Sequence, residues 1–208
     1  GCRDNWDTAF GEQEFISRMV SLARAADLPF PRTLLVTYYV SLKTNPFVIL
    51  TGVEGSGKTE LVSLFAEAFL GSHSPQYALI KGDASWLNAT GDQHSFRSLL
   101  DHFTSLRFLE LLQEAVDPGS AGKAFVVCFD GMHPAEVNYY FATLLSIDDA
   151  GRKRLNLPGV PDDDRPIVPP NVSITATVNT AEYAGALSAD VLRPAGLIAF
   201  RAPKTGAS

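Results

Sequence analysis

One stretch constrains this chain more than any other, the segment from Gly52 to Thr59, which reads Gly-Val-Glu-Gly-Ser-Gly-Lys-Thr. It fits the pattern G-x-x-x-x-G-K-T of a phosphate-binding loop. An apolar run at 47–51 precedes it and a helical pattern at 58–70 follows it, so a strand is predicted to lead into the loop and a helix to leave it. Backbone N–H groups in such a turn, together with the positive end of the helix, bind phosphate oxygens. The predicted nucleotide-binding residues are Gly52, Val53, Glu54, Gly55, Ser56, Gly57, Lys58 and Thr59.

The loop predicts partners for both the phosphates and a metal. Lys58 is expected to reach the β- and γ-phosphates, and the Thr59 hydroxyl to ligate Mg²⁺. Asp130 follows an apolar run at 124–129 that is typical of a strand buried on both faces. A carboxylate at the end of such a strand is expected to hold Mg²⁺, directly or through water. The alternative is an aspartate that only caps the next helix.

Two further residues are candidates for catalysis. Asn179 ends the predicted strand 172–178, where an amide can orient the attacking water or sense the γ-phosphate; a simple turn asparagine is the alternative. Arg193 ends a short predicted helix at 187–192. It is either an arginine finger for the nucleotide of a neighbouring subunit or a surface residue that stabilises the end of its helix.

The order of elements predicts the fold class. Strands alternate with helices, which indicates an α/β domain with a parallel sheet covered by helices on both faces. Helices are also predicted at 11–26, 33–42, 96–116 and 134–146. Residues 148–170 show no periodicity and are expected to form a long loop, in which Asp162, Asp163 and Asp164 either bind a metal or form a solvated run. The five predicted strands are 47–51, 77–80, 124–129, 172–178 and 197–200.

Composition narrows the functional class. The chain has 208 residues, a net charge of −6 and no basic block, which argues against a dedicated nucleic-acid-binding surface within it. Its two cysteines indicate neither a disulfide framework nor a zinc site. No apolar run is long enough for a membrane span, so a cytoplasmic setting is expected. We expect an N-terminal helical extension at 1–45, a nucleotide-binding core at 46–203 and a tail at 204–208.

Several stretches resemble the AAA+ ATPase core, and more narrowly its McrB-like branch, the NTPase subunits of methylation-dependent restriction systems. The phosphate loop alone is generic, whereas the run from Pro-Pro-Asn to Thr-Val-Asn is more specific. The matching stretches are 41–50, 83–86 with Gly91, 137–141 with 144–146, and 169–172 continuing to 177–180.

The resemblance implies a P-loop NTPase sandwich with a five-stranded sheet of order 5-1-4-3-2. It also implies ATP or GTP with Mg²⁺ as ligands, and a homo-oligomeric, usually hexameric, ring that drives or gates a partner nuclease. The family asparagine corresponds to Asn179 and its arginine finger to Arg193. The best-known McrB-like members use GTP, while most AAA+ proteins use ATP.

The chain departs from this pattern in three places. The family has a glutamate, the base that polarises the attacking water, directly after the metal-binding aspartate; here Gly131 stands there. The further arginines expected after Arg193 are absent, and the helical lid is not expected within this sequence. Two functions therefore remain: a hydrolysing McrB-like NTPase, or a hydrolysis-deficient module that binds nucleotide and assembles. A phosphotransferase with the same loop is a weaker third interpretation.

Overall fold

A computed structural model describes residues 11–45, 47–82, 108–139, 141, 145–147, 153–155, 165–179 and 187–200. The matching stretch 83–86 with Gly91, residues 96–107 of the helix predicted at 96–116, and the Asp162–Asp164 run lie outside these residues. None of the helices in the described ranges has both the length and the apolar character needed to cross a membrane.

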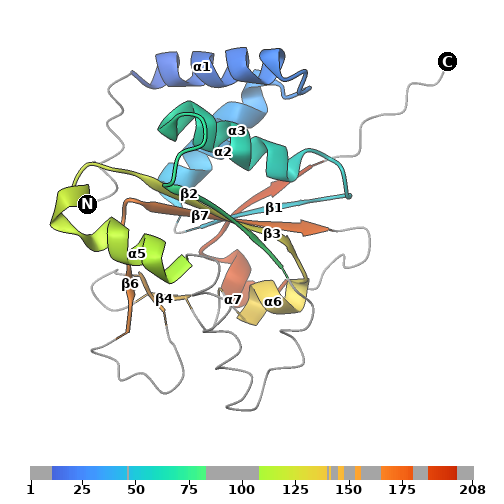
Figure 1. Ribbon diagram of the computed structural model, residues 1–208. Coiled ribbons are helices and arrows are strands. Elements are labelled where there is room, and N and C mark those ends of the chain that lie inside the picture. Colours follow the sequence, from blue (N-terminus) through green and yellow to red (C-terminus); the bar gives the residue numbers. More distant parts are fainter. Residues whose placement is uncertain are drawn as a thin grey trace.

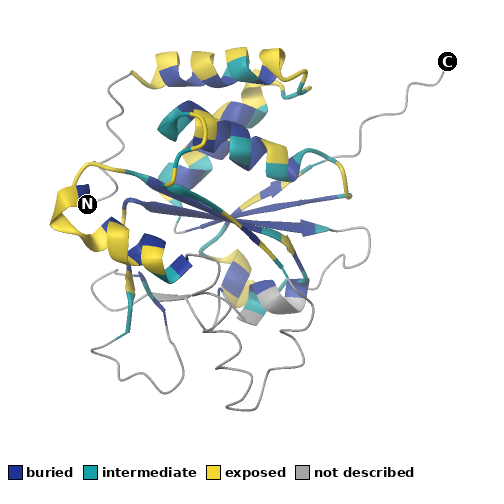
Figure 2. Cartoon of the chain, in the orientation of Figure 1, coloured by how far each residue is buried: buried dark blue, intermediate teal, exposed yellow. Residues whose placement is uncertain are grey.

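A five-stranded parallel sheet forms the centre of the molecule (Figure 1). The strand order is β2-β3-β7-β1-β8, which confirms the predicted order 5-1-4-3-2 when the strands are counted along the chain. The central strands are almost entirely buried, as expected for a sheet covered on both faces (Figure 2). The strands are β1 (Val48–Gly52), β2 (Tyr77–Lys81), β3 (Phe125–Met132), β7 (Val172–Asn179) and β8 (Gly196–Ala199).

Helices cover the two faces of the sheet as separate groups (Figure 1). On one face lie α1 (Glu12–Ala25), α2 (Arg32–Thr44) and α3 (Lys58–Leu70), whose apolar sides form one core cluster with β1 and β3. On the other face lie α5 (Phe108–Val116), α6 (Pro134–Tyr139) and α7 (Ala189–Leu192). A short 3₁₀ helix, Pro118–Ser120, follows α5 in the chain. A second cluster, which includes Phe47 stacked on Phe141, fills that side.

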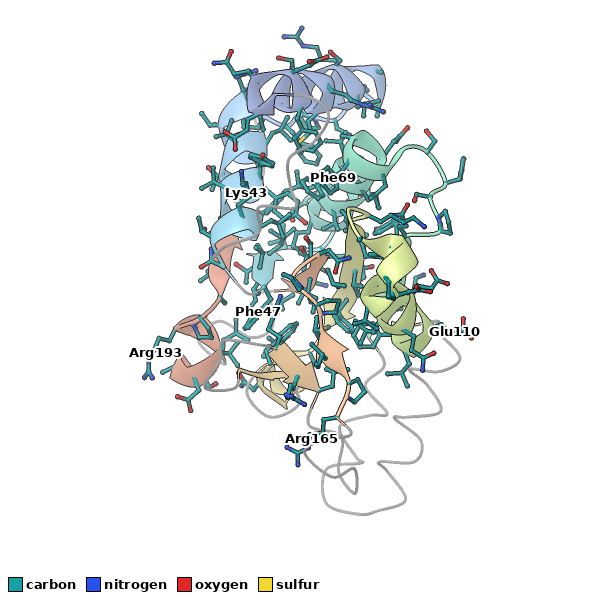
Figure 3. The ribbon with its side chains drawn as sticks, turned by 90° about the vertical axis from the view of Figure 1, so that its left-hand side faces the viewer. Lys43, Phe47, Phe69, Glu110, Arg165 and Arg193 are labelled. Carbon is teal, nitrogen blue, oxygen red and sulfur yellow. The ribbon has the colours of Figure 1, made fainter. Side chains whose placement is uncertain are left out.

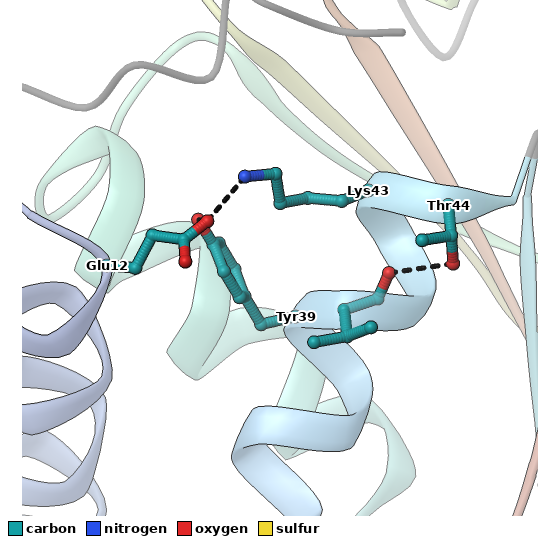
Figure 4. A network of polar contacts seen from close by, with 5 residues as sticks. Glu12, Tyr39, Lys43 and Thr44 are labelled. Carbon is teal, nitrogen blue, oxygen red and sulfur yellow. Dashed lines mark hydrogen bonds and ion pairs between the residues drawn. The ribbon is translucent and has the colours of Figure 1, made fainter.

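The N-terminal helix is attached to the domain by both apolar and polar contacts. Phe15 of α1 packs edge-on against Phe65 of α3 with ring centroids 5.6 Å apart. At the surface, Lys43 Nζ lies 2.6 Å from Glu12 Oε1, and the Tyr39 hydroxyl donates to the same carboxylate oxygen (Figure 4). These contacts join α1 to α2 and so place both helices on the face of the sheet that carries α3.

Two sequence predictions for the region after Asp130 are wrong. The helix predicted at 134–146 is too long: α6 covers Pro134–Tyr139, Phe141 is π-helical, and residues 145–147 form strand β4 (Leu145–Ile147). The predicted loop at 148–170 contains β5 (Lys153–Leu155) and β6 (Ile167–Val168), and the three strands form a small antiparallel sheet. Strands of two or three residues are too short to show the alternation by which a sequence reveals a strand.

Candidate nucleotide-binding site

The phosphate loop connects β1 to α3 as the motif predicts. Gly55 has φ +71° and Gly57 has φ +93°. Residues other than glycine adopt this left-handed backbone only at an energetic cost. Gly57 is also the residue from which α3 starts, and the first backbone N–H groups of any helix lack intrahelical acceptors. The loop therefore presents donors and the positive end of a helix dipole to an anion.

The side chain of Lys58 lies against the phosphate loop, and the residue is 6 % exposed. Its Nζ is 2.7 Å from the carbonyl oxygen of Val53, 3.1 Å from that of Gly52 and 3.3 Å from Ser56 Oγ. Burial lowers the pKa of this ammonium, while the negative charge of Asp130 acts in the opposite direction. In this arrangement the backbone carbonyl groups of the loop hold the lysine at the position where phosphate oxygens would compete for it.

Asp130 and Thr59 meet beside the loop. Thr59 Oγ1 donates to Asp130 Oδ1 at 2.5 Å, although β3 and α3 are separate elements. A hydroxyl and a carboxylate are the hard oxygen ligands that Mg²⁺ uses, with phosphate and water completing its coordination. The donor set formed by Thr59 and Asp130 therefore fits Mg²⁺, the metal that the sequence predicts.

Asn179 completes the group at the same end of the sheet. It pairs in register with Gly52, so β1 and β7 end side by side. Its Oδ1 accepts a hydrogen bond from Lys58 Nζ at 3.2 Å. With the oxygen used in this way, the NH₂ group is left as donor, which is the polarity needed to bind a γ-phosphate oxygen or a water.

Arg193 does not join this group. Gly196, three residues further on, opens β8 and pairs with Val48, the first residue of β1. Since β1 runs from Val48 towards the phosphate loop, Arg193 lies at the amino end of the sheet and the loop at the carboxyl end. The arginine is exposed and points away from the body of the molecule (Figure 3). It therefore lies away from a nucleotide held in its own loop.

A bulge in β3 lies directly at Asp130. The register of β3 against β7 shifts between Phe129 and Met132, so that Asp130 and Gly131 together face Thr177. Gly131 has φ +67° and is exposed, and a Cβ at this position would meet nothing within 4 Å. Two residues opposite one is a β-bulge, and its second residue is a glycine in the left-handed region; bulges re-aim neighbouring side chains.

Sequence analysis missed one contact of this site. Thr177 donates to Asp130 Oδ1 at 2.7 Å, and the only sequence signal was a polar residue within a buried strand. Phe30 and Phe200 flank the loop with ring centroids 6.5 Å apart. A Cβ on Gly57 would lie 2.9 Å from the Phe30 ring, which shows how closely that ring approaches the loop.

Comparisons with known proteins agree with this fold. No protein-family model and no curated protein matches the sequence. Among solved structures, the chain is similar to the S. cerevisiae Hsp104–ADP complex, with a TM-score of 0.56 and 14 % identity. The match covers 93 % of this chain and 37 % of that one, so this chain spans little more than a third of it. The sheet order and this likeness show the fold of a P-loop NTPase sandwich of the AAA+ large-subdomain type.

Proposed function

We propose that this chain is an AAA+ domain of the McrB-like branch that binds ATP or GTP together with Mg²⁺. The observation that carries the proposal is the convergence of Lys58, Thr59, Asp130 and Asn179, from separate segments, beside one phosphate loop. The similar Hsp104 structure is a complex with ADP, which is consistent with a nucleotide on this fold.

Each residue has a distinct part in holding the ligand. Lys58 would exchange its carbonyl partners for β- and γ-phosphate oxygens, and its charge would offset theirs. Thr59 and Asp130 would hold Mg²⁺, which when bound neutralises charge on the β- and γ-phosphates. Asn179 would direct its amide towards the γ-phosphate or a water beside it.

The proposal extends to assembly. The McrB-like stretches support a homo-oligomeric ring, usually of six subunits, that drives or gates a partner nuclease in restriction or defence in the cytoplasm. The position of Arg193 at the far end of the sheet supports action on a neighbouring subunit, because a finger in trans must lie away from its own loop. Neither a nucleic-acid-binding site nor a membrane contact is part of the proposal.

A second function is favoured by Gly131. The position after Asp130 carries no side chain and has φ +67°. Loss of a general base lowers a rate roughly 10²- to 10⁴-fold. The hydrolysis-deficient alternative is therefore a module that binds nucleotide, assembles and regulates without appreciable turnover.

Nucleotide affinity tests the first part. Dissociation constants for mant-ATP and mant-GTP should be measured by fluorescence for the wild-type chain, Lys58→Ala and Lys43→Ala. Lys43 is a matched control, since it carries the same charge on α2 and pairs with Glu12. We expect Lys58→Ala to abolish measurable binding and Lys43→Ala to leave it unchanged. Equal affinity for wild type and Lys58→Ala would refute the site.

Turnover separates the two functions. Steady-state hydrolysis of ATP and GTP should be compared for wild type, Gly131→Glu and Gly131→Ala. Gly131→Ala introduces the same backbone strain without a carboxylate and is the proper reference. Turnover by the wild type at ordinary AAA+ rates would contradict the hydrolysis-deficient alternative. A gain specific to Gly131→Glu would show that the missing carboxylate is what limits the rate.

A further inference from the structure

The Thr177 hydroxyl has a fixed direction because of its two partners. The backbone N–H of Gly131 donates to Thr177 Oγ1 at 2.8 Å. A threonine hydroxyl has one hydrogen, and since Oγ1 accepts from Gly131, that hydrogen is directed to Asp130 Oδ1 at 2.7 Å. Thr177 itself is 1 % exposed, so its hydroxyl lies inside the protein, where these two bonds satisfy it. Thr177 thus ties the bulge backbone and the carboxylate together.

The two hydrogen bonds of Thr177 matter because they lie at the β-bulge in β3. A carboxylate beside an irregular backbone has more freedom than one in a regular strand, and Gly131 makes the backbone there more permissive still. Thr59 reaches the same carboxylate oxygen at 2.5 Å from the other side. Asp130 is therefore held between two hydroxyls, one from the phosphate loop and one from the neighbouring strand.

We propose that Thr177 is a positioning residue that orients Asp130 for the Mg²⁺–nucleotide complex. The inference rests on the proposed function, because it assigns a role within that site. Hydrogen bonds to a metal-ligating carboxylate from residues outside the coordination sphere typically change metal affinity roughly 10- to 100-fold. Loss of the Thr177 hydroxyl should then weaken the contribution of Mg²⁺ to nucleotide binding, and leave metal-free binding to the loop intact.

Thr175 provides a matched control on the same strand. It is also 1 % exposed, and it lies two residues away, so its side chain faces the same side of the sheet. Its hydroxyl is 2.7 Å from the buried Tyr38 hydroxyl on α2, so its hydrogen-bond partner is Tyr38 and not Asp130. The two threonines share residue type, strand and burial, and differ in whether the hydroxyl reaches the site.

The experiment compares nucleotide binding with and without the metal. Dissociation constants for mant-ATP and mant-GTP should be measured in excess Mg²⁺ and in EDTA for wild type, Thr177→Val, Thr177→Ser and Thr175→Val, with thermal unfolding of each. We expect Thr177→Val to lower the ratio of the EDTA constant to the Mg²⁺ constant by roughly 10-fold. The ratio should stay near wild type for Thr177→Ser, which keeps the hydroxyl, and for Thr175→Val, which should only unfold at a lower temperature.

The outcomes are distinguishable. An unchanged ratio for Thr177→Val, or an equal weakening with and without Mg²⁺, overturns the positioning role while leaving the site itself in place. A fall in the ratio for Thr175→Val to the same extent also overturns it, because the effect would then come from general destabilisation. Absence of binding by the wild type under both conditions refutes the proposed function. If Thr177→Val does not fold, Thr177→Ala gives the same comparison.

Discussion

The left-handed backbone at Gly131 makes a quantitative prediction for Gly131→Ala. At φ +67° an L-residue costs roughly 1–2 kcal/mol relative to glycine. No steric cost is added, since a Cβ at this position meets nothing within 4 Å. The hydrogen bond from the backbone N–H to Thr177 is retained, because alanine keeps that group. We therefore expect a loss of about 1–2 kcal/mol in the free energy of unfolding from backbone strain alone.

Urea denaturation and thermal unfolding measure this loss. For a chain of this length, about 1 kcal/mol corresponds to roughly 2–4 °C in Tm, so a decrease of about 2–8 °C is expected. Gly122→Ala is the control, since Gly122 is exposed, has φ +87° and has equally open surroundings at the other end of β3. Both variants should lose similar stability.

A neutral or stabilising effect of Gly131→Ala, with Gly122→Ala destabilising as expected, would refute the bulge geometry. It would show that residue 131 adopts an ordinary extended backbone in solution. In that case the absence of a side chain would be the only notable property of Gly131. With the bulge present, glycine is instead the residue that this backbone requires.

Two further predictions concern the helices that cover the sheet. Tyr38→Phe should cost about 1–3 kcal/mol because it leaves the buried Thr175 hydroxyl without its partner, and adding Thr175→Val should restore part of that loss; additive losses would contradict this. Glu12→Gln tests a surface pair, because the hydrogen bond from Lys43 lowers the pKa of Glu12 from its ordinary value. Because the pKa of Glu12 is lower in the folded state, its ionised form stabilises the fold at pH values above the ordinary pKa. This stabilisation is lost as the pH falls through the folded pKa. The small Tm difference from wild type should therefore be present at neutral pH and vanish in acid, and one that grew in acid would contradict the pairing.

The main elements of the fold could be predicted because their signals are local. The phosphate loop is a contiguous motif, and the apolar runs ending at Asp130 and Asn179 are long enough to identify buried strands. In a parallel sheet these strand ends lie at one edge, so the meeting of Lys58, Asp130 and Asn179 followed from topology. The amino-end position of Arg193 follows from the same rule, since it precedes its strand.

The bulge could not be predicted because its cause is not local. Gly131 adopts its backbone opposite Thr177, which lies 46 residues away in the sequence. When the register of β3 against β7 is not known, a glycine at position 131 indicates only that a side chain is missing there. The approach of the Phe30 ring to Gly57 is hidden for the same reason, since it depends on how the segment before α2 lies over the loop.

The strand order also governs when the nucleotide loop can form during folding. β1, which leads into the loop, pairs only with β7 and β8 in the sheet, and both come from the last part of the described chain. Contacts so distant in sequence form slowly, because a long segment must be closed into a loop before they can be made. On the ribosome, β1 would therefore remain unpaired until residues 172–199 had been synthesised and had emerged. Nucleotide binding would thus indicate that the sheet is complete, and not merely that its formation has started.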